Sequence, residues 1–186
     1  GRCDSLLNLV FGNETVYAES IDKLLENIQI TRPTIMLAVP RVFEKIYEKV
    51  LLDIRKSSSL KQGVFNWAMN AANKYYDTIA KDKSPSTVEI IQYNAAYKLV
   101  FEKVYQKFGG RIRYFISGGA PLSTGIIEFL RNANLTLLEG YGLTETIAPC
   151  CLNPFSKQIT GTVGRPMGDV EFKFAEDFEI LIKTKG

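Results

Sequence analysis

The chain has 186 residues, of which 46% are hydrophobic and 23% are charged, and its formal net charge is +3. This length and composition are typical of one globular domain with a sizeable core. No apolar run approaches the roughly 18 residues that a membrane-spanning helix needs, and the absence of histidine excludes histidine-based triads and histidine metal sites.

The N-terminal part of the chain predicts a strand, a helix and a second strand. Residues 15–18 have the pattern of a short strand, and Ser20 is a candidate N-cap for a helix over about 21–28. The apolar run 34–39 predicts the second strand, which Pro40 ends. This order of elements indicates a βαβ unit and therefore a parallel sheet.

Residues 48–108 predict a helical layer beside that sheet, which we expect to be an insertion. A second helix is expected over about 60–80, and a third from Ser86 to about Phe108, where a glycine pair ends it. Glu89 lies three residues after Ser86, which is the spacing of a capping box. The first helix is expected from apolar residues that recur at helical spacing, at positions 42, 43, 46, 47, 50, 51 and 54.

Charge and cysteine content favour a cytoplasmic protein. Residues 41–107 carry more lysine and arginine than aspartate and glutamate, whereas the rest of the chain is slightly acidic. We interpret these basic residues as a solvated helical face, with attraction to anionic phosphate or peripheral contact with a membrane as the alternatives. Three cysteines, of which Cys150 and Cys151 are adjacent, do not make a disulfide framework and indicate reduced thiols.

The alternation of strands and helices resumes in the second half of the chain. We expect a strand at 114–116, a helix at 123–132 and a strand at 135–138. Alternating apolar residues on both sides of positions 175–177 predict a β-hairpin over about 170–182. The expected fold class is therefore α/β: a mostly parallel sheet with flanking helices, a helical insertion and a C-terminal β-hairpin.

Two glycine-containing segments follow predicted strands. The first is Ser117-Gly118-Gly119-Ala120-Pro121, and the second is Glu139-Gly140-Tyr141-Gly142-Leu143-Thr144-Glu145-Thr146. Ligands of open α/β sheets bind beyond the carboxyl ends of the strands, and glycine allows the backbone to approach a ligand closely. The second segment offers an aromatic ring for a base, a hydroxyl for a phosphate oxygen and a carboxylate for magnesium. The alternatives are a tight turn without a ligand, a buried core tyrosine and a carboxylate at a helix N-terminus.

The second segment resembles the adenylate-forming enzymes, and most closely the long-chain acyl-CoA synthetases. The tyrosine-glycine-x-threonine-glutamate core at 141–145 is the most specific internal signature of that superfamily. Further stretches that resemble the family lie at 32–34 and 40–47, at 110–113 and at 161–166. The chain departs from the usual pattern at 167–169 and at Phe178.

The resemblance implies a nucleotide site. Tyr141 would pack against adenine, with residues 119–121 on the other side of the base. Thr144 would bond the α-phosphate and Glu145 would bind Mg²⁺, so both are the implied catalytic residues. The implied nucleotide-binding residues are, in chain order, Gly118, Gly119, Ala120, Pro121, Glu139, Gly140, Tyr141, Gly142 and Thr144.

The resemblance also implies the reaction and its partners. A fatty carboxylate attacks the α-phosphorus of ATP and expels pyrophosphate, and CoA then takes the acyl group from the acyl-adenylate. The expected partners are a long-chain fatty acid, ATP and CoA, and no nucleic acid. The candidate walls of an acyl slot are Val39, Phe43, Ile116 and Ala148, with ordinary core packing as the alternative for each.

Members of the family are longer than this chain, so we expect residues 1–186 to be one fragment of the large N-terminal, AMP-binding domain. Within it, 48–108 is the helical segment and 111–166 holds the nucleotide-site loops. The family's upstream phosphate loop and its C-terminal domain with a catalytic lysine do not occur in this sequence, so we expect the isolated fragment to be inactive. The alternatives are a fatty acyl-AMP ligase, an aryl-CoA ligase, or a nucleotide-binding module without catalysis.

Overall fold

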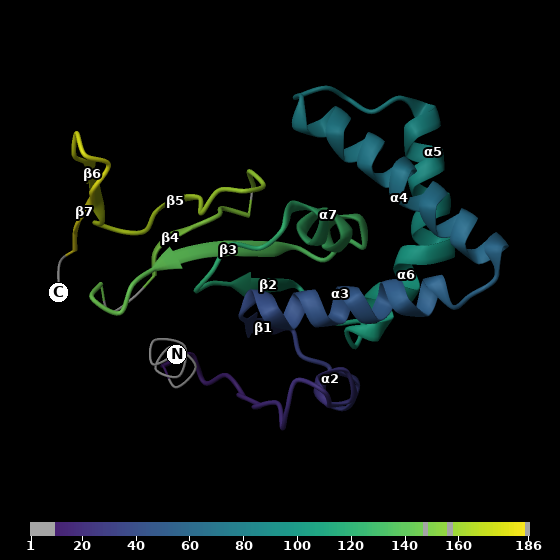
Figure 1. Ribbon diagram of the computed structural model, residues 1–186, viewed down its shortest axis with the longest axis horizontal. Coiled ribbons are helices and arrows are strands. Elements are labelled where there is room, and N and C mark those ends of the chain that lie inside the picture. The colour runs from purple at the N-terminus through teal and green to yellow at the C-terminus, as the bar shows by residue number, and fades with distance from the viewer. Residues whose placement is uncertain (1–9, 147–148, 156–157, 185–186) are drawn as a thin grey trace.

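The computed structural model describes residues 10–146, 149–155 and 158–184. Figure 1 shows a central sheet with a helical hairpin at one end of the molecule and a small β-hairpin at the other. Among these residues, no helix is both long and apolar enough to cross a membrane. The helices are α2 (Leu24–Thr31), α3 (Pro40–Arg55), α4 (Ser59–Ala80), α5 (Thr87–Ala96), the π-helix η1 (Tyr97–Phe101), α6 (Glu102–Lys107) and α7 (Thr124–Asn132).

The sheet has five strands in the order β1-β2-β3-β4-β5. Strands β1, β2 and β3 are parallel, whereas β4 pairs antiparallel with β3 and β5 pairs antiparallel with β4, so the sheet is mixed. A separate antiparallel hairpin, β6–β7, confirms the predicted C-terminal hairpin. The strands are β1 (Ile35–Ala38), β2 (Tyr114–Ser117), β3 (Leu137–Gly142), β4 (Pro149–Leu152), β5 (Arg165–Pro166), β6 (Glu171–Phe174) and β7 (Ile180–Lys183).

The core lies on one face of the parallel strands. In β2, Phe115 and Ser117 are buried while Tyr114 and Ile116 are partly exposed, as the alternation of side chains along a strand requires. Phe43 of α3 packs edge-on against Phe115 with 5.4 Å between ring centroids. The helices α3 and α7 thus cover the face that carries Phe115, and α4 packs on both of them.

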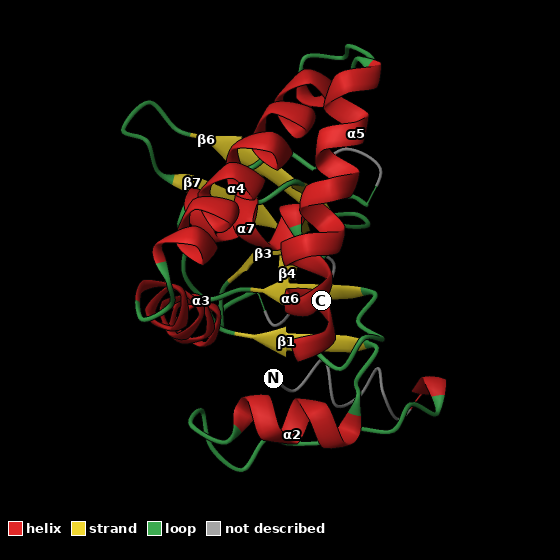
Figure 2. Ribbon diagram, turned by 90° about the vertical axis from the view of Figure 1, so that its right-hand side faces the viewer, coloured by secondary structure: helices red, strands yellow, loops and turns green. Residues whose placement is uncertain are grey.

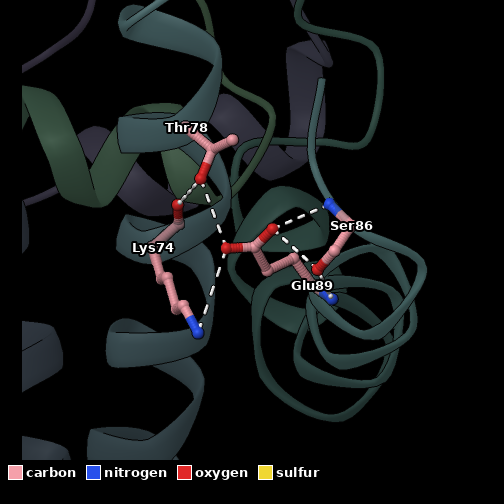
Figure 3. Close-up of polar contacts among 4 residues, drawn as sticks. All are labelled: Lys74, Thr78, Ser86 and Glu89. Carbon is pink, nitrogen blue, oxygen red and sulfur yellow. Dashed lines mark hydrogen bonds and ion pairs between the residues drawn. The ribbon is translucent and has the colours of Figure 1, made fainter. Parts of the chain in front are cut away.

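The helical layer is a hairpin of α4 and α5 that projects beyond the sheet (Figures 1 and 2). The predicted capping box is present, because the Ser86 and Glu89 side chains each accept a hydrogen bond from the other's backbone N–H. Glu89 also accepts a hydrogen bond from Thr78 Oγ1 at 3.3 Å and lies 3.9 Å from Lys74 Nζ (Figure 3). One carboxylate therefore caps α5 and joins it to α4.

Three predicted elements differ from the structure. Residues 15–18 form no strand, so β1 pairs only with β2 among the described residues and the first βαβ unit is not formed. Helix α2 begins at Leu24 instead of residue 21, although Ser20 Oγ does accept a hydrogen bond from the Lys23 N–H at 3.3 Å. The third helix contains a π-turn, in which the Glu102 N–H bonds the Tyr97 carbonyl.

Candidate nucleotide-binding site

The two glycine segments lie next to each other at the end of β2, where the second segment continues β3. Ser117 and Glu139 are partners in the parallel register of these strands. A Cβ added to Gly118 would lie 3.5 Å from the Gly140 carbonyl oxygen, and one added to Gly140 would lie 3.9 Å from the Ser117 carbonyl oxygen. Both distances are ordinary van der Waals contacts, so the backbones of the two segments lie close together.

The sequence predicted that the second segment is a loop from Glu139 onward, but its first residues belong to a strand. Strand β3 continues through residues 139–142, because β4 pairs antiparallel with this extension and Tyr141 lies opposite Cys151. The register shifts between Tyr141 and Gly142, and such a bulge re-aims the residues that follow it. Tyr141 is half-buried, so part of its side chain remains accessible.

Thr144 and Glu145 lie in a turn that Thr146 closes. The Leu143 N–H donates to Thr146 Oγ1 at 3.0 Å, and this hydroxyl donates to the Leu143 carbonyl at 3.0 Å. The side chains of Thr144 and Glu145 are both exposed. The turn thus presents one hydroxyl and one carboxylate to solvent next to the end of β3.

The Glu145 carboxylate could bind magnesium only together with a bound nucleotide. Among the described residues, no group of three His, Cys, Asp or Glu side chains could enclose a metal ion. Mg²⁺ is commonly held by one or two carboxylates together with substrate phosphates. Glu145 alone can therefore serve only a magnesium ion that a bound nucleotide also coordinates.

Glu139 is half-buried in β3, next to the end of β2. Burial raises the pKa of the Glu139 carboxyl, and the neighbouring backbone N–H groups of Leu122 and Gly161 oppose that rise.

Asn153 is a site residue that the sequence did not reveal. Its side chain is buried, its Nδ2 donates to the Thr162 carbonyl, and its Oδ1 accepts from the Ile159 N–H at 3.4 Å. Its own N–H donates to the Glu139 carbonyl at 3.0 Å. A hollow of about 320 Å³ lies beside it, lined by Asn153, Pro154, Ile159, Thr162, Gly164 and Arg165.

Gly161 and Gly164, in the stretch at 161–166, have the left-handed backbone conformation that favours glycine. Gly164 has a φ of +81°, and a Cβ there would collide with the Leu152 carbonyl oxygen and the Asn153 backbone. The Met167 N–H donates to the Cys150 carbonyl at 2.8 Å, which continues the β4–β5 pairing. The end of this stretch thus pairs with β4, on the side of β4 that faces away from β3 and Tyr141.

The three described residues of the predicted acyl slot lie in different environments. Phe43 is fully buried in the core, and Val39 precedes α3 with 55% of its surface exposed. Ile116 points to the face of β2 opposite the Phe43 partner Phe115. Ala148 lies outside the described residues. The acyl slot stays a prediction.

Comparisons with known proteins identify the family of this chain and agree with its fold. Residues 1–180 match the model of the family described as AMP-binding enzyme. The chain is 31% identical over 167 residues to long-chain-fatty-acid–CoA ligase FadD15 of Mycobacterium bovis, covering 90% of this chain and 27% of that protein. It is 32% identical over 179 residues to the peroxisomal long chain acyl-CoA synthetase 6 of Arabidopsis thaliana, covering 94% of this chain and 24% of that protein.

The solved structures extend the likeness to the fold. ATP-bound MatB from Rhodopseudomonas palustris matches with a TM-score of 0.54 at 20% identity, over 96% of this chain and 26% of that one. The chain spans about a quarter of the length of the curated relatives that it matches. Both the family match and the two relatives cover most of the sequence, and the chain therefore belongs to the AMP-binding enzyme family.

Proposed function

We propose that this chain forms part of the nucleotide site of an ATP-dependent long-chain fatty acid–CoA ligase. The observation that carries the proposal is that the Gly118 segment, just after β2, lies against Gly140 of β3, with Tyr141, Thr144 and Glu145 following on the same strand and the turn after it. The names of the relatives support the choice of a fatty acid as the carboxylate and CoA as the acceptor.

The proposed reaction has two steps. The fatty carboxylate attacks the α-phosphorus of ATP, pyrophosphate leaves, and an acyl-adenylate forms. The CoA thiolate then attacks the acyl carbonyl, and AMP leaves as the acyl-CoA forms. The first nucleophile is already ionised at neutral pH, so the step needs no histidine base, in agreement with a chain that has none.

This chain's residues would bind and orient the nucleotide. The partly exposed ring of Tyr141 would pack against adenine, and the Thr144 hydroxyl would donate to an α-phosphate oxygen. Glu145 would hold Mg²⁺, which supplies positive charge for the phosphate oxygens when it is bound. The lack of side chains at Gly118 and Gly119 would let the backbone of this segment approach the nucleotide closely.

A cytoplasmic location and a peripheral membrane contact belong to the same proposal. Five lysines of the helical layer are exposed and would lie near an anionic lipid surface, namely Lys56, Lys61, Lys74, Lys81 and Lys83. A basic residue near such a surface contributes on the order of 1 kcal/mol. Reversal of all five to glutamate should weaken binding of the full-length enzyme to anionic vesicles at low salt, and unchanged binding would leave only the solvated-face interpretation.

The test of the nucleotide site is pyrophosphate exchange by the full-length enzyme that contains this segment. Thr144→Ala should lower the adenylation rate about tenfold or more, since a hydrogen bond to a charged group is lost. Glu145→Gln should raise the Mg²⁺ concentration that gives half-maximal exchange. Thr87→Ala and Glu176→Gln are matched controls, because these side chains are exposed on α5 and beside the β6–β7 turn.

The outcomes separate the alternatives. Unchanged exchange in both site variants would mean that the nucleotide site is wrongly assigned. Exchange that depends on an aromatic carboxylate, or that stops at the acyl-adenylate with CoA present, would favour an aryl-CoA ligase or a fatty acyl-AMP ligase. Nucleotide binding without any exchange would favour a module without catalysis.

A further inference from the structure

A groove of about 720 Å³ lies among helices α2, α3 and α6 and the π-helix η1. Two of its lining residues are joined, because Gln29 Nε2 donates to the Gln106 carbonyl at 2.8 Å. Just after them, Arg32 Nε donates to the Gly109 carbonyl at 2.9 Å, so α2 and α6 end together before β1 and β2 begin. The groove is therefore near the starting edge of these parallel strands, whereas the nucleotide loops follow their ends.

The groove carries more positive than negative charge. Its charged lining residues are four lysines and two glutamates, namely Lys49, Lys98, Lys103, Lys107, Glu26 and Glu102. Lys107 forms an ion pair with Asp53 at 3.6 Å, but within the described ranges Lys49, Lys98 and Lys103 form none. Ammonium groups without an ionic partner around a groove attract an anionic partner.

An exposed apolar row precedes the groove lysines on the same helix. Val88, Ile91 and Leu99 are 61%, 62% and 56% exposed. They recur at the spacing of one helical face, with the small residue Ala95 between Ile91 and Leu99. Single exposed apolar residues are ordinary on a protein surface, but several on one face mark a contact site.

The π-turn brings the apolar row and the groove lysines to the same side. Helices α5, η1 and α6 follow one another without a break, and Figure 2 shows α5 running on into α6. In an α-helix each residue advances by about 100°, so a row with four-residue spacing drifts around the axis. The residue that the π-turn adds offsets this drift, so Val88 and Lys107 are about five full turns apart and face the same way.

We propose that this side of the helix, which we name the α5–α6 face, docks on an anionic phospholipid surface. The face consists of Val88, Ile91, Leu99, Lys98, Lys103 and Lys107. Helices that lie in a membrane interface bury apolar side chains below the headgroups, and lysines reach lipid phosphates from long apolar stems. A soluble acidic segment would match the lysines but would leave the three apolar side chains in water.

This inference rests on the peripheral membrane contact in the proposed function and gives that contact a different surface. None of the five lysines named there lies between Thr87 and Lys107. They would attract a membrane from a distance, whereas the α5–α6 face would touch the lipid. Because the nucleotide loops follow the other edge of the sheet, changes on this face leave the residues of the adenylation step in place.

The first experiment is co-sedimentation of the full-length enzyme with vesicles. The vesicles contain equimolar phosphatidylcholine and phosphatidylserine, or phosphatidylcholine alone. Lys98→Gln combined with Lys103→Gln should weaken binding to the anionic vesicles roughly tenfold or more, since two basic residues near the lipid are lost. The control is Lys173→Gln with Lys183→Gln, which removes the same charge from exposed positions of the β6–β7 hairpin and should bind as the wild type does.

Two results of this experiment would overturn the proposal. One is wild-type binding to phosphatidylcholine alone that equals binding to the anionic vesicles. The other is unchanged binding of the Lys98 and Lys103 variant. Pyrophosphate exchange without vesicles should be the same in all these variants, which shows that they are folded.

A second variant tests the apolar half of the face. Ile91→Gln should weaken binding to the anionic vesicles roughly fivefold, because the side chain no longer favours the interface. Val16→Gln is the control, since Val16 is 56% exposed in the segment before α2. Weaker binding of the lysine variant together with unchanged binding of Ile91→Gln would show a contact with charge alone and would overturn docking of the apolar row.

A label at position 99 locates the contact directly. A polarity-sensitive fluorophore attached to Leu99→Cys of the full-length enzyme should shift its emission to shorter wavelength with anionic vesicles and not with phosphatidylcholine alone. A label that is shielded from water before vesicles are added would show that the rest of the enzyme covers this face. An unshifted label on an enzyme that does bind the vesicles would place the contact elsewhere, for example at the five lysines. Either result would overturn the proposal.

Failure of the proposed ligase function has a different signature, because pyrophosphate exchange without vesicles measures it independently of lipid binding. An enzyme that docks through the α5–α6 face and shows no exchange would keep the lipid contact and lose the ligase assignment. An enzyme that exchanges pyrophosphate and does not bind the anionic vesicles would overturn only the contact proposed here.

Discussion

Replacement of Phe43 by alanine distinguishes a core residue from a wall of the acyl slot. Phe43 lies on α3 with 1% of its surface exposed, and its ring packs edge-on against Phe115 at 5.4 Å. Phe115 in turn packs against Phe108 at 5.1 Å. The substitution would therefore open a cavity in the centre of the aromatic core.

The expected cost follows from the burial of this ring. Truncation of a buried phenylalanine to alanine destabilises a protein by about 3–5 kcal/mol. Domains of this kind have total stabilities of about 5–15 kcal/mol, so Phe43→Ala should remove a large part of the free energy of unfolding. For a chain of this length, about 2–4 °C is lost per kcal/mol, which predicts a fall of roughly 6–20 °C in the unfolding midpoint.

Urea unfolding followed by circular dichroism provides the assay, with Val39→Ala as the control. Val39 was predicted for the same slot, but 55% of its surface is exposed, so its truncation should change stability by no more than about 0.5 kcal/mol. If Phe43→Ala unfolded within about 1 kcal/mol of the wild type, its ring would not be packed in the core. A slot open to a fatty acid would then be the better explanation of this residue.

Three further predictions concern backbone geometry and capping. Gly164→Ala should cost at least about 1–2 kcal/mol, because a left-handed residue would carry a Cβ that collides with the Leu152 carbonyl, and an unchanged urea midpoint would contradict this. Ser86→Ala should cost about 1 kcal/mol through loss of the N-cap of α5, whereas Ser84→Ala, outside the helix, should leave the thermal midpoint unchanged. Hydrogen bonds from Ser86 hold the pKa of Glu89 below its ordinary value of 4.5. The ionised Glu89 therefore stabilises the fold at pH values above 4.5, and this stabilisation is lost as the pH falls through the lower pKa of the folded state. The difference in stability between wild type and Glu89→Gln should therefore shrink on acidification from about pH 6 to about pH 3, and a constant difference would refute the linkage.

Elements with a strong local signal were predictable from the sequence. The apolar stripe that includes Phe43 predicted α3, and the spacing of Ser86 and Glu89 predicted the capping box of α5. The alternation around residues 175–177 predicted the β6–β7 hairpin. In each case the information lies within one helix, one helix cap or one hairpin, where residues near in sequence determine the conformation.

Elements that depend on distant partners were not predictable in the same way. Strands β4 and β5 are short, and β4 pairs with a glycine-rich segment that lacks the apolar alternation of a strand. The π-turn at η1 adds one residue to a turn, so the buried residues Ala96 and Phe101 are five positions apart instead of three or four. For residues 15–18 the sequence predicted a strand that the structure does not contain, because strand propensity alone does not form a ladder without a neighbouring strand.

In the candidate site, too, some residues could be predicted from the sequence and others could not. Glycine, tyrosine, threonine and glutamate at 140–145 have side-chain chemistry that suggests a nucleotide from the sequence alone. The contacts of Asn153 could not be predicted, since its side chain bonds backbone N–H and carbonyl groups. Backbone groups occur in every residue, so the sequence does not mark them, and only the fold brings them within hydrogen-bonding distance.

The change from parallel to antiparallel pairing at β3 accounts for the shape of the site. Strand β2 ends at Ser117, where the chain turns away into the Gly118 segment, whereas β3 continues to Gly142 because β4 supplies an antiparallel partner for Tyr141. The signature residues are therefore held on a strand extension that reaches past the end of its parallel neighbour. A Cβ at Gly140 would lie 3.3 Å from Leu152 Cδ1 and 3.4 Å from the Cys151 carbonyl oxygen, so a side chain would fit tightly at this position of the pairing. Packing between β3 and β4 thus restricts Gly140 whether or not a nucleotide is bound, and the same packing fixes where Tyr141 lies.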